Sequence, residues 1–270
     1  TTCSTGGFSN YDASFGKFVG PAEWVSSLFM VLASIPFVRR IQAARGDFKP
    51  IWRDTQIRAF LRYIFYAVAI IVLYRLFYMH QGADPWDVTR ETTFNVITIF
   101  SGTGFASTNV LQWGHLPFAL LFCVALIGGC TGSTGCSVKI FRYQVLFQAV
   151  RAQIKRMQSP HRLYPLRLAG KRLEPEVVNS VMAFFTMFVL TFGLLIVGLA
   201  LPGLHPKTAL TGAWTAIANV GPVWGPEITS NGSVERFPEL AKWMMTFGMY
   251  LGRLELVSVF VLFLPRFWRA

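Results

Sequence analysis

Hydrophobic positions along the chain gather into long blocks that short polar segments separate. Three blocks have the length of membrane-spanning helices: Val19–Val38, Tyr63–Met79 and Val177–Leu201. Trp243–Leu264 is a fourth, although Arg253 and Glu255 interrupt it, and Leu116–Ile127 begins a fifth. About 20 helical residues cover the hydrocarbon core of a bilayer. The pattern therefore predicts an all-α membrane protein that crosses the bilayer several times, with a further helix over Gln144–Met157.

Two shorter apolar segments, Trp86–Phe100 and Pro206–Val220, are too short to cross a bilayer and are predicted to be re-entrant or buried helices. Pro85 suits the first turn of a helix, and the nearby Asp84 and Asp87 suit its N-terminus. Each of these half-helices leads into a glycine motif. The negative end of the helix dipole then faces a position where a cation would be stabilised.

The glycine motifs lie in three stretches, 3–9, 100–106 and 218–223. In each, a Thr or Val precedes a Gly, with steps of 98 and 117 residues between the pairs Thr5–Gly6, Thr103–Gly104 and Val220–Gly221. Ion filters are built from backbone carbonyls of such segments, and glycine permits the backbone angles that this requires. The pattern predicts three walls of an ion filter. The alternative is three ordinary turns.

A run of small residues interrupts the span that begins at Leu116. The sequence from Gly128 to Cys136 contains four glycines and cannot form a helix that faces lipid. Irregular backbone at membrane depth is tolerated only inside protein or beside water. The run therefore predicts a loop that lines a pore, and the alternative is a helix-packing surface through Gly128-x-x-x-Gly132.

The distribution of charge supports a membrane location and indicates which loops face the cytoplasm. Of the 270 residues, 53% are hydrophobic and 14% charged, and the net charge is +12. Sixteen of the 25 Lys and Arg residues fall in two blocks, Arg39–Arg62 and Lys139–Arg172, which are typical of cytoplasmic loops. Acidic residues mark the side of the glycine motifs. No aromatic stacking platform accompanies the basic blocks, so a nucleic-acid partner is not expected.

Three arginines lie in or beside the spans. Arg62 and Arg75, at opposite ends of Tyr63–Met79, are expected to snorkel to the interfaces. Arg253 lies within the last span, where a charge is costly and usually faces water or the bundle interior. Glu255 is two positions away, roughly 200° around a helix, and therefore is not its expected partner. Arg253 is predicted to face the pore.

The order span, half-helix, glycine motif, span repeats along the chain. The expected units are residues 1–45, the second half of an incomplete pore unit; 46–157, a complete unit with the loop at 128–136; and 158–270, the last unit. The chain opens inside a glycine motif, with no half-helix before it. We therefore expect it to be the C-terminal part of a longer chain.

This organisation resembles the Trk/Ktr/HKT superfamily of potassium transporters, and within it the bacterial TrkH and TrkG proteins. The resemblance covers essentially the whole chain. It rests on Ser4–Phe8, Ala44–Phe48, Ser101–Phe105, Ile127–Gly135, Ala218–Pro222 and Met249–Arg253. In that superfamily, four span–pore helix–filter–span units surround one pore with pseudo-fourfold symmetry. The present chain would supply the second filter and everything after it.

The resemblance implies potassium uptake through a gated pore in the bacterial cytoplasmic (inner) membrane. Potassium would be coordinated by Thr5, Gly6, Thr103, Gly104, Val220 and Gly221. The gate under the filter would comprise Gly128, Gly129, Thr131, Gly132, Ser133, Thr134 and Gly135, and Arg253 would face the pore below the filter. The implied partners are a second copy of the protein and a cytosolic nucleotide-binding subunit of TrkA type.

Two functions of other classes compete with ion transport. Ser133 invites comparison with the nucleophile of an intramembrane hydrolase, which needs an adjacent base. The four histidines, His80, His115, His161 and His205, all lie near span ends or in loops, so an enzyme is not expected. A non-conducting membrane scaffold is the second alternative, and an ion-flux measurement distinguishes it from a transporter.

Overall fold

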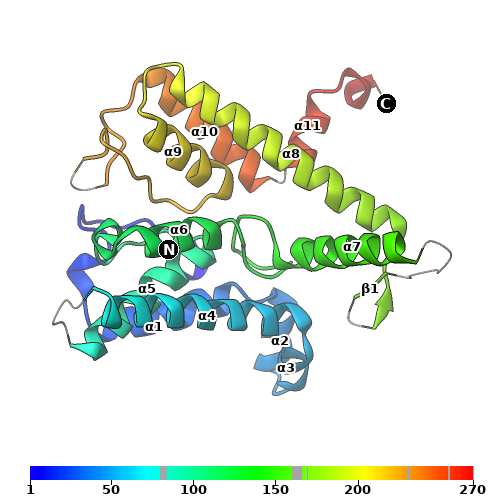
Figure 1. Ribbon diagram of the computed structural model, residues 1–270, viewed down its shortest axis with the longest axis horizontal. Coiled ribbons are helices and arrows are strands. Elements are labelled where there is room, and N and C mark those ends of the chain that lie inside the picture. Colours follow the sequence, from blue (N-terminus) through cyan, green and yellow to red (C-terminus); the bar gives the residue numbers. More distant parts are fainter. Residues whose placement is uncertain (80–83, 160–165, 169, 230–231, 255, 270) are drawn as a thin grey trace.

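The chain is built almost entirely from helices (Figure 1). A computed structural model describes residues 1–79, 84–159, 166–168, 170–229, 232–254 and 256–269. The α-helices are α1 Pro21–Ala33, α2 Phe37–Ala44, α3 Lys49–Arg53, α4 Thr55–Phe77, α5 Pro85–Ser101, α6 His115–Ala125, α7 Ile140–Gln158, α8 Pro175–Ala200, α9 Pro206–Ala218, α10 Glu239–Arg253 and α11 Leu256–Leu262. Short 3₁₀ turns cover Thr2–Ser4, Gly16–Phe18, Val110–Trp113 and Pro265–Arg269, and β1 Arg167–Leu168 pairs antiparallel with β2 Lys171–Arg172.

In the part of the chain that the structure describes, two helices, α4 and α8, are long and apolar enough to cross a membrane alone. They confirm the spans expected over Tyr63–Met79 and Val177–Leu201. Helix α4 starts earlier than expected because the Asp54 side chain accepts a hydrogen bond from Gln56 N at 2.9 Å and caps it. The half-helices α5 and α9 are confirmed, and each has Pro at its first position.

The span expected over Val19–Val38 is a bent pair of helices, which together are long and apolar enough to cross a membrane. Helices α1 and α2 meet at 109°. Pro36 lacks a backbone N–H, and the residue before a proline avoids the helical region, so the helix stops before it. The span expected over Trp243–Leu264 is likewise divided, into α10 and α11, which also diverge by 109°.

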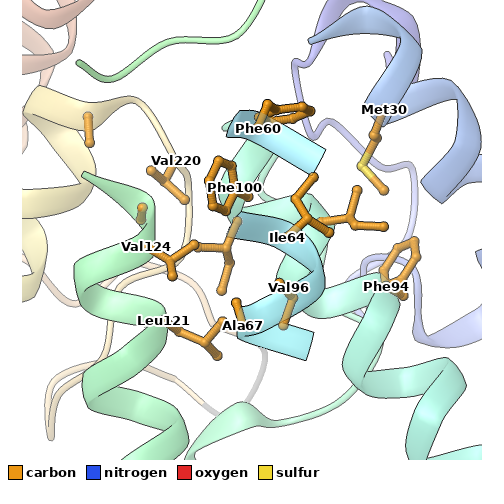
Figure 2. Packing of buried hydrophobic residues seen from close by; sticks show 14 of the residues in the cluster. Met30, Phe60, Ile64, Ala67, Phe94, Val96, Phe100, Leu121, Val124 and Val220 are labelled. Atoms are coloured by element: carbon orange, nitrogen blue, oxygen red, sulfur yellow. The ribbon is translucent and has the colours of Figure 1, made fainter. Parts of the chain in front are cut away.

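Two hydrophobic clusters hold the helices together. The first surrounds α5 with α1, α4 and α6, and Figure 2 shows Phe100 of α5 between Phe60 and Val124. The second lies among α8, α9 and α10. The Trp214 ring of α9 stacks on Phe122 of α6 within the first cluster, with ring centroids 5.2 Å apart, and Leu126 and Phe192 pack against both clusters. The unit boundaries at residues 45 and 157 stay a prediction.

Helix α10 approaches α8 and α9 closely because of Gly248 and Gly252. A Cβ on Gly248 would lie 2.9 Å from a Leu195 methyl group of α8. A Cβ on Gly252 would overlap the carbonyl oxygen of Ile217, at the end of α9. The close packing that Gly248-x-x-x-Gly252 predicts is therefore present.

We predict that Gly252→Ala destabilises the protein by about 1–3 kcal/mol, because the added methyl group overpacks a backbone contact that cannot move alone. Thermal unfolding in detergent measures the effect. Gly193→Ala on α8 is the matched control, since nothing lies within 4 Å of the position that its Cβ would occupy. Equal melting temperatures for the two variants would show that α10 does not depend on this contact.

Candidate ion filter and gate

The three glycine motifs share one hydrogen-bond pattern. In each, a backbone N–H donates to the carbonyl of a threonine five residues earlier. The three bonds are Gly6 N to Thr1 O at 3.1 Å, Thr103 N to Thr98 O at 2.9 Å and Val220 N to Thr215 O at 3.3 Å. The backbone therefore follows the same path after each half-helix and after the short turn at the start of the chain.

Backbone angles repeat in the same register. The residue before each bonded N–H is left-handed: Thr5 at φ 50°, Gly102 at 72° and Asn219 at 52°. The residue after it is a glycine of positive φ: Gly7 at 65°, Gly104 at 85° and Gly221 at 116°. A side chain at such angles is strained, which explains the glycines.

This repeat differs by one residue from the register expected at the first motif. Gly7, not Gly6, corresponds to Gly104 and Gly221 in the structure, and Thr5 corresponds to Gly102 rather than to Thr103. The sequence contained a signal for this register. Ser4 and Phe8 precede Ser101 and Phe105 by 97 residues, as Gly7 precedes Gly104.

The three motifs lie against one another. A Cβ on Gly7 would overlap the carbonyl oxygen of Thr103, and a Cβ on Gly104 would overlap that of Val220. Thr103 and Val220 are buried, and Figure 2 places the Val220 side chain near Phe100 and Val124. Three segments that are far apart in the sequence thus form one continuous wall of backbone.

The loop at 128–136 is irregular, as expected, and closed at its base. Ile127 and Val138 form a parallel bridge in which Gly128 N donates to Val138 O at 2.8 Å. At Gly128 a Cβ would overlap the Cys136 carbonyl, so only glycine fits there. Gly132 has φ +76° and open space around it, so its backbone angle rather than crowding requires glycine.

The broken backbone between α1 and α2 holds this loop. Cys130 N donates to Ser34 O at 3.1 Å, and Phe37 N donates to Gly132 O at 2.9 Å. The Thr134 hydroxyl donates to Ala33 O at 3.1 Å. The first span is therefore bent where its free backbone groups pair with those of the loop.

The far end of the loop touches all three motifs. Thr5 Oγ1 donates to Thr134 O at 3.1 Å. A Cβ on Gly135 would lie 3.0 Å from Ser101 O. The Ser137 hydroxyl donates to Ala218 O, at the end of α9, at 2.9 Å. The loop thus lies directly against the three motifs, and its role as a gate stays a prediction.

A cavity of about 460 Å³ opens on the other side of the loop. Its lining includes residues 132–137 of the loop and three cationic side chains, Lys139, Arg142 and Arg253. Arg253 Nη1 lies 3.5 Å from Thr134 O and contacts Cys136 Sγ. Arg253 is exposed to this cavity, and Glu255 lies outside the described residues.

The remaining loop residues have local partners. Thr131 N donates to Gln56 Oε1 of α4 at 3.0 Å, and Ser133 Oγ donates to Cys130 O at 2.7 Å. His115 starts α6 and His205 caps α9, whereas His80 and His161 lie outside the described residues. Among the described residues, neither a histidine nor a carboxylate hydrogen-bonds Ser133 Oγ.

The expectation that Arg75 snorkels is wrong. Its side chain is 5% exposed, and it donates to Glu91 Oε2 at 3.1 Å and to Thr92 Oγ1 at 3.0 Å. Its guanidinium also lies 4.3 Å from the centroid of the Trp113 ring. The partners of this charge come from α5 and from the turn that ends at Trp113. The sequence alone did not reveal that these groups lie together.

Glu227 holds the start of α9. Its carboxylate accepts hydrogen bonds from His205 N at 2.7 Å and from Thr208 Oγ1. Desolvation raises the pKa of Glu227, but these hydrogen bonds outweigh it and hold the pKa below its ordinary value of 4.5. The ionised form therefore stabilises the folded state.

This fold and site define a multi-pass α-helical membrane protein with three repeated glycine motifs and an irregular loop packed against them. The chain belongs to the TrkH family of cation transport proteins, whose family model matches residues 1–270. The expected family and the all-α membrane fold are thereby confirmed.

Individual proteins of the Trk system are similar to this chain over its whole length. The potassium uptake protein TrkI of Halomonas elongata is 37% identical over 271 residues, covering 100% of this chain and 54% of that protein. TrkH of Vibrio parahaemolyticus is 31% identical over 275 residues, covering 100% of this chain and 56% of that protein. The crystal structure of the V. parahaemolyticus potassium transporter TrkH superposes with a TM-score of 0.90 at 29% identity, covering 99% of this chain and 57% of that one. The chain spans about half the length of these relatives.

We predict that Glu227→Gln lowers thermal stability at neutral pH and that the difference from the parent disappears in acid. A lowered carboxyl pKa contributes stability above the unfolded value of 4.5, and this contribution is lost as the pH falls through the folded pKa. Melting temperatures from pH 7 downward test this. A difference that persists unchanged at the acid end would contradict it.

Proposed function

We propose that this chain forms the filter and gate of a pore for potassium uptake. The observation that carries the proposal is the continuous wall built by Thr5–Gly7, Gly102–Gly104 and Asn219–Gly221, with one hydrogen-bond pattern and one set of backbone angles. Rings of backbone carbonyls replace the hydration shell of potassium in channel filters. The names of the relatives TrkI and TrkH, potassium uptake proteins, support the same ion.

Potassium is the transported substrate in this proposal. Backbone carbonyls of Thr103, Gly104, Val220 and Gly221 coordinate it, as the sequence predicts. In the first motif, the repeat favours Gly6 and Gly7 as the counterparts of these pairs, with Thr5 at the inner end. The three segments form three sides of the pseudo-fourfold ring in this proposal.

The loop at 128–136 is the gate in this proposal, and Arg253 is the charge below it. The loop lies between the filter segments and the cationic cavity. The charge of Arg253 opposes a cation at this depth, and its guanidinium restrains the Thr134 carbonyl. Both features limit flow through the pore.

The membrane and a monovalent cation are the partners that family membership supports. We further propose a homodimer in the bacterial inner membrane, regulated by a TrkA-type nucleotide-binding subunit. The basic segments at 39–62 and 139–172 would face the cytosol and this subunit. A non-conducting scaffold is the competing function, and it predicts no ion flux.

We predict that Gly104→Ala lowers the rubidium-to-sodium flux ratio by about tenfold, in liposomes that contain a full-length Trk protein with this sequence. The methyl group overlaps Val220 O and opposes a φ of 85°, so the carbonyl ring loses its register.

Gly203→Ala is the matched control for this test, because Gly203 also has positive φ (94°) but nothing lies within 4 Å of its added Cβ. An unchanged ratio for Gly104→Ala would remove this glycine from the filter. Absence of flux in the folded parent would favour the scaffold.

We predict that Arg253→Ala increases rubidium flux on the order of tenfold. A unit charge ~10 Å from the ion costs about 1.7 kcal/mol at an effective dielectric constant of ~20. Arg253→Lys keeps the charge and is the control. If the alanine variant is folded but no faster than the lysine variant, the charge does not limit flow.

A further inference from the structure

The Thr5 side chain occupies an unusual position. Its backbone is left-handed, with φ 50°, whereas the corresponding residues of the other two motifs are Gly102 and Asn219. Glycine and asparagine tolerate this conformation, but a β-branched residue is strained in it. Such strain persists only where surrounding contacts offset it, and it gathers at functional sites.

The contact that offsets the strain joins the filter to the gate. Thr5 is 4% exposed, and its hydroxyl lies 3.1 Å from Thr134 O of the loop. The same hydroxyl is 2.8 Å from Ser4 O, so its one hydrogen is shared between a neighbouring carbonyl and a distant one. Within the described residues, neither corresponding residue forms a side-chain hydrogen bond to the loop, since Gly102 has no side chain and the Asn219 amide donates to Met249 O at 2.9 Å.

Thr134 O is the point where these contacts meet. It accepts from Thr5 Oγ1, on the filter side, and from Arg253 Nη1 at 3.5 Å, on the cavity side. Next to it, Thr134 N and Thr134 Oγ1 both donate to Ala33 O, at 3.4 and 3.1 Å. One residue of the loop is thus held by the filter, by the bend of the first span and by the last span.

We propose that the Thr5 hydroxyl is a latch that holds the gate loop closed against the filter. The backbone of Thr5 stays part of the filter, and the hydroxyl acts as a positioning group on Thr134. Breaking the hydroxyl contact frees the loop without moving the glycines that shape the ion path. This inference rests on the proposed function, because it assigns a regulatory role to the same site.

The test compares Thr5→Val, Thr5→Ser and Thr5→Gly in a full-length Trk protein that contains this sequence. Valine keeps the shape and the β-branch but loses the donor, and serine keeps the donor. Glycine removes the donor and also relieves the strain at φ 50°, so it remains informative if valine fails to fold. Thr186→Val is the matched control, since that hydroxyl donates only to Met182 O within α8.

Amide hydrogen exchange of residues 128–136 measures the latch directly, and rubidium flux measures its consequence. A neutral hydrogen bond contributes about 1 kcal/mol, so we expect valine and glycine to raise loop exchange and flux roughly three- to tenfold. Serine and Thr186→Val should match the parent.

Unchanged exchange in both the valine and glycine variants would overturn the latch. Raised exchange without raised flux would overturn its role in gating. Absence of flux in the parent would instead contradict the proposed function, and the exchange measurement would still decide whether Thr5 holds the loop. A double variant tests whether the two contacts at the Thr134 carbonyl depend on each other. Because Thr5→Val and Arg253→Ala act on one carbonyl, the rise in flux of the double variant should be smaller than the rises of the two single variants combined.

Discussion

Backbone polar groups at membrane depth must find partners inside the protein, and this constraint shapes the centre of the molecule. Two irregular segments meet there, the bend at residues 34–36 and the loop at 128–136. Each would be costly alone in hydrocarbon. Together they exchange hydrogen bonds, as between Cys130 N and Ser34 O. The bend of the first span and the break in the later span therefore supply hydrogen-bond partners for each other.

The same centre depends on close approach of backbone to backbone. Gly7, Gly104 and Gly252 each lie where an added Cβ would overlap a carbonyl oxygen of another segment. Glycine at these sites supplies both unusual angles and the absence of a side chain. In the proposed pore, carbonyl oxygens of these segments form the surface of the wall. A selective pore for a bare cation requires that surface.

Much of the fold followed from the sequence. The long apolar runs predicted α4 and α8, and the short ones predicted the half-helices α5 and α9. The irregular loop at 128–136 followed from its glycine content. The register of the first motif was missed, because Thr5–Gly6 alone matches the pair Thr103–Gly104, whereas the 97-residue spacing of Ser4 and Phe8 from Ser101 and Phe105 gives the observed register. Hydrogen bonds to a threonine five residues earlier distinguish the two registers in the structure.

The sequence by itself determined the class of protein, since apolar length, sidedness of charge and glycine motifs depend on local composition and spacing. Tertiary structure decided which charges are paired and which spans are broken. Arg75 looked like a snorkelling residue until α5 placed Glu91 beside it. Val19–Val38 looked like one helix until a loop about a hundred residues away supplied partners for its freed backbone groups. Periodicity cannot reveal such pairings, because the energy of a buried polar group depends on which distant group lies next to it.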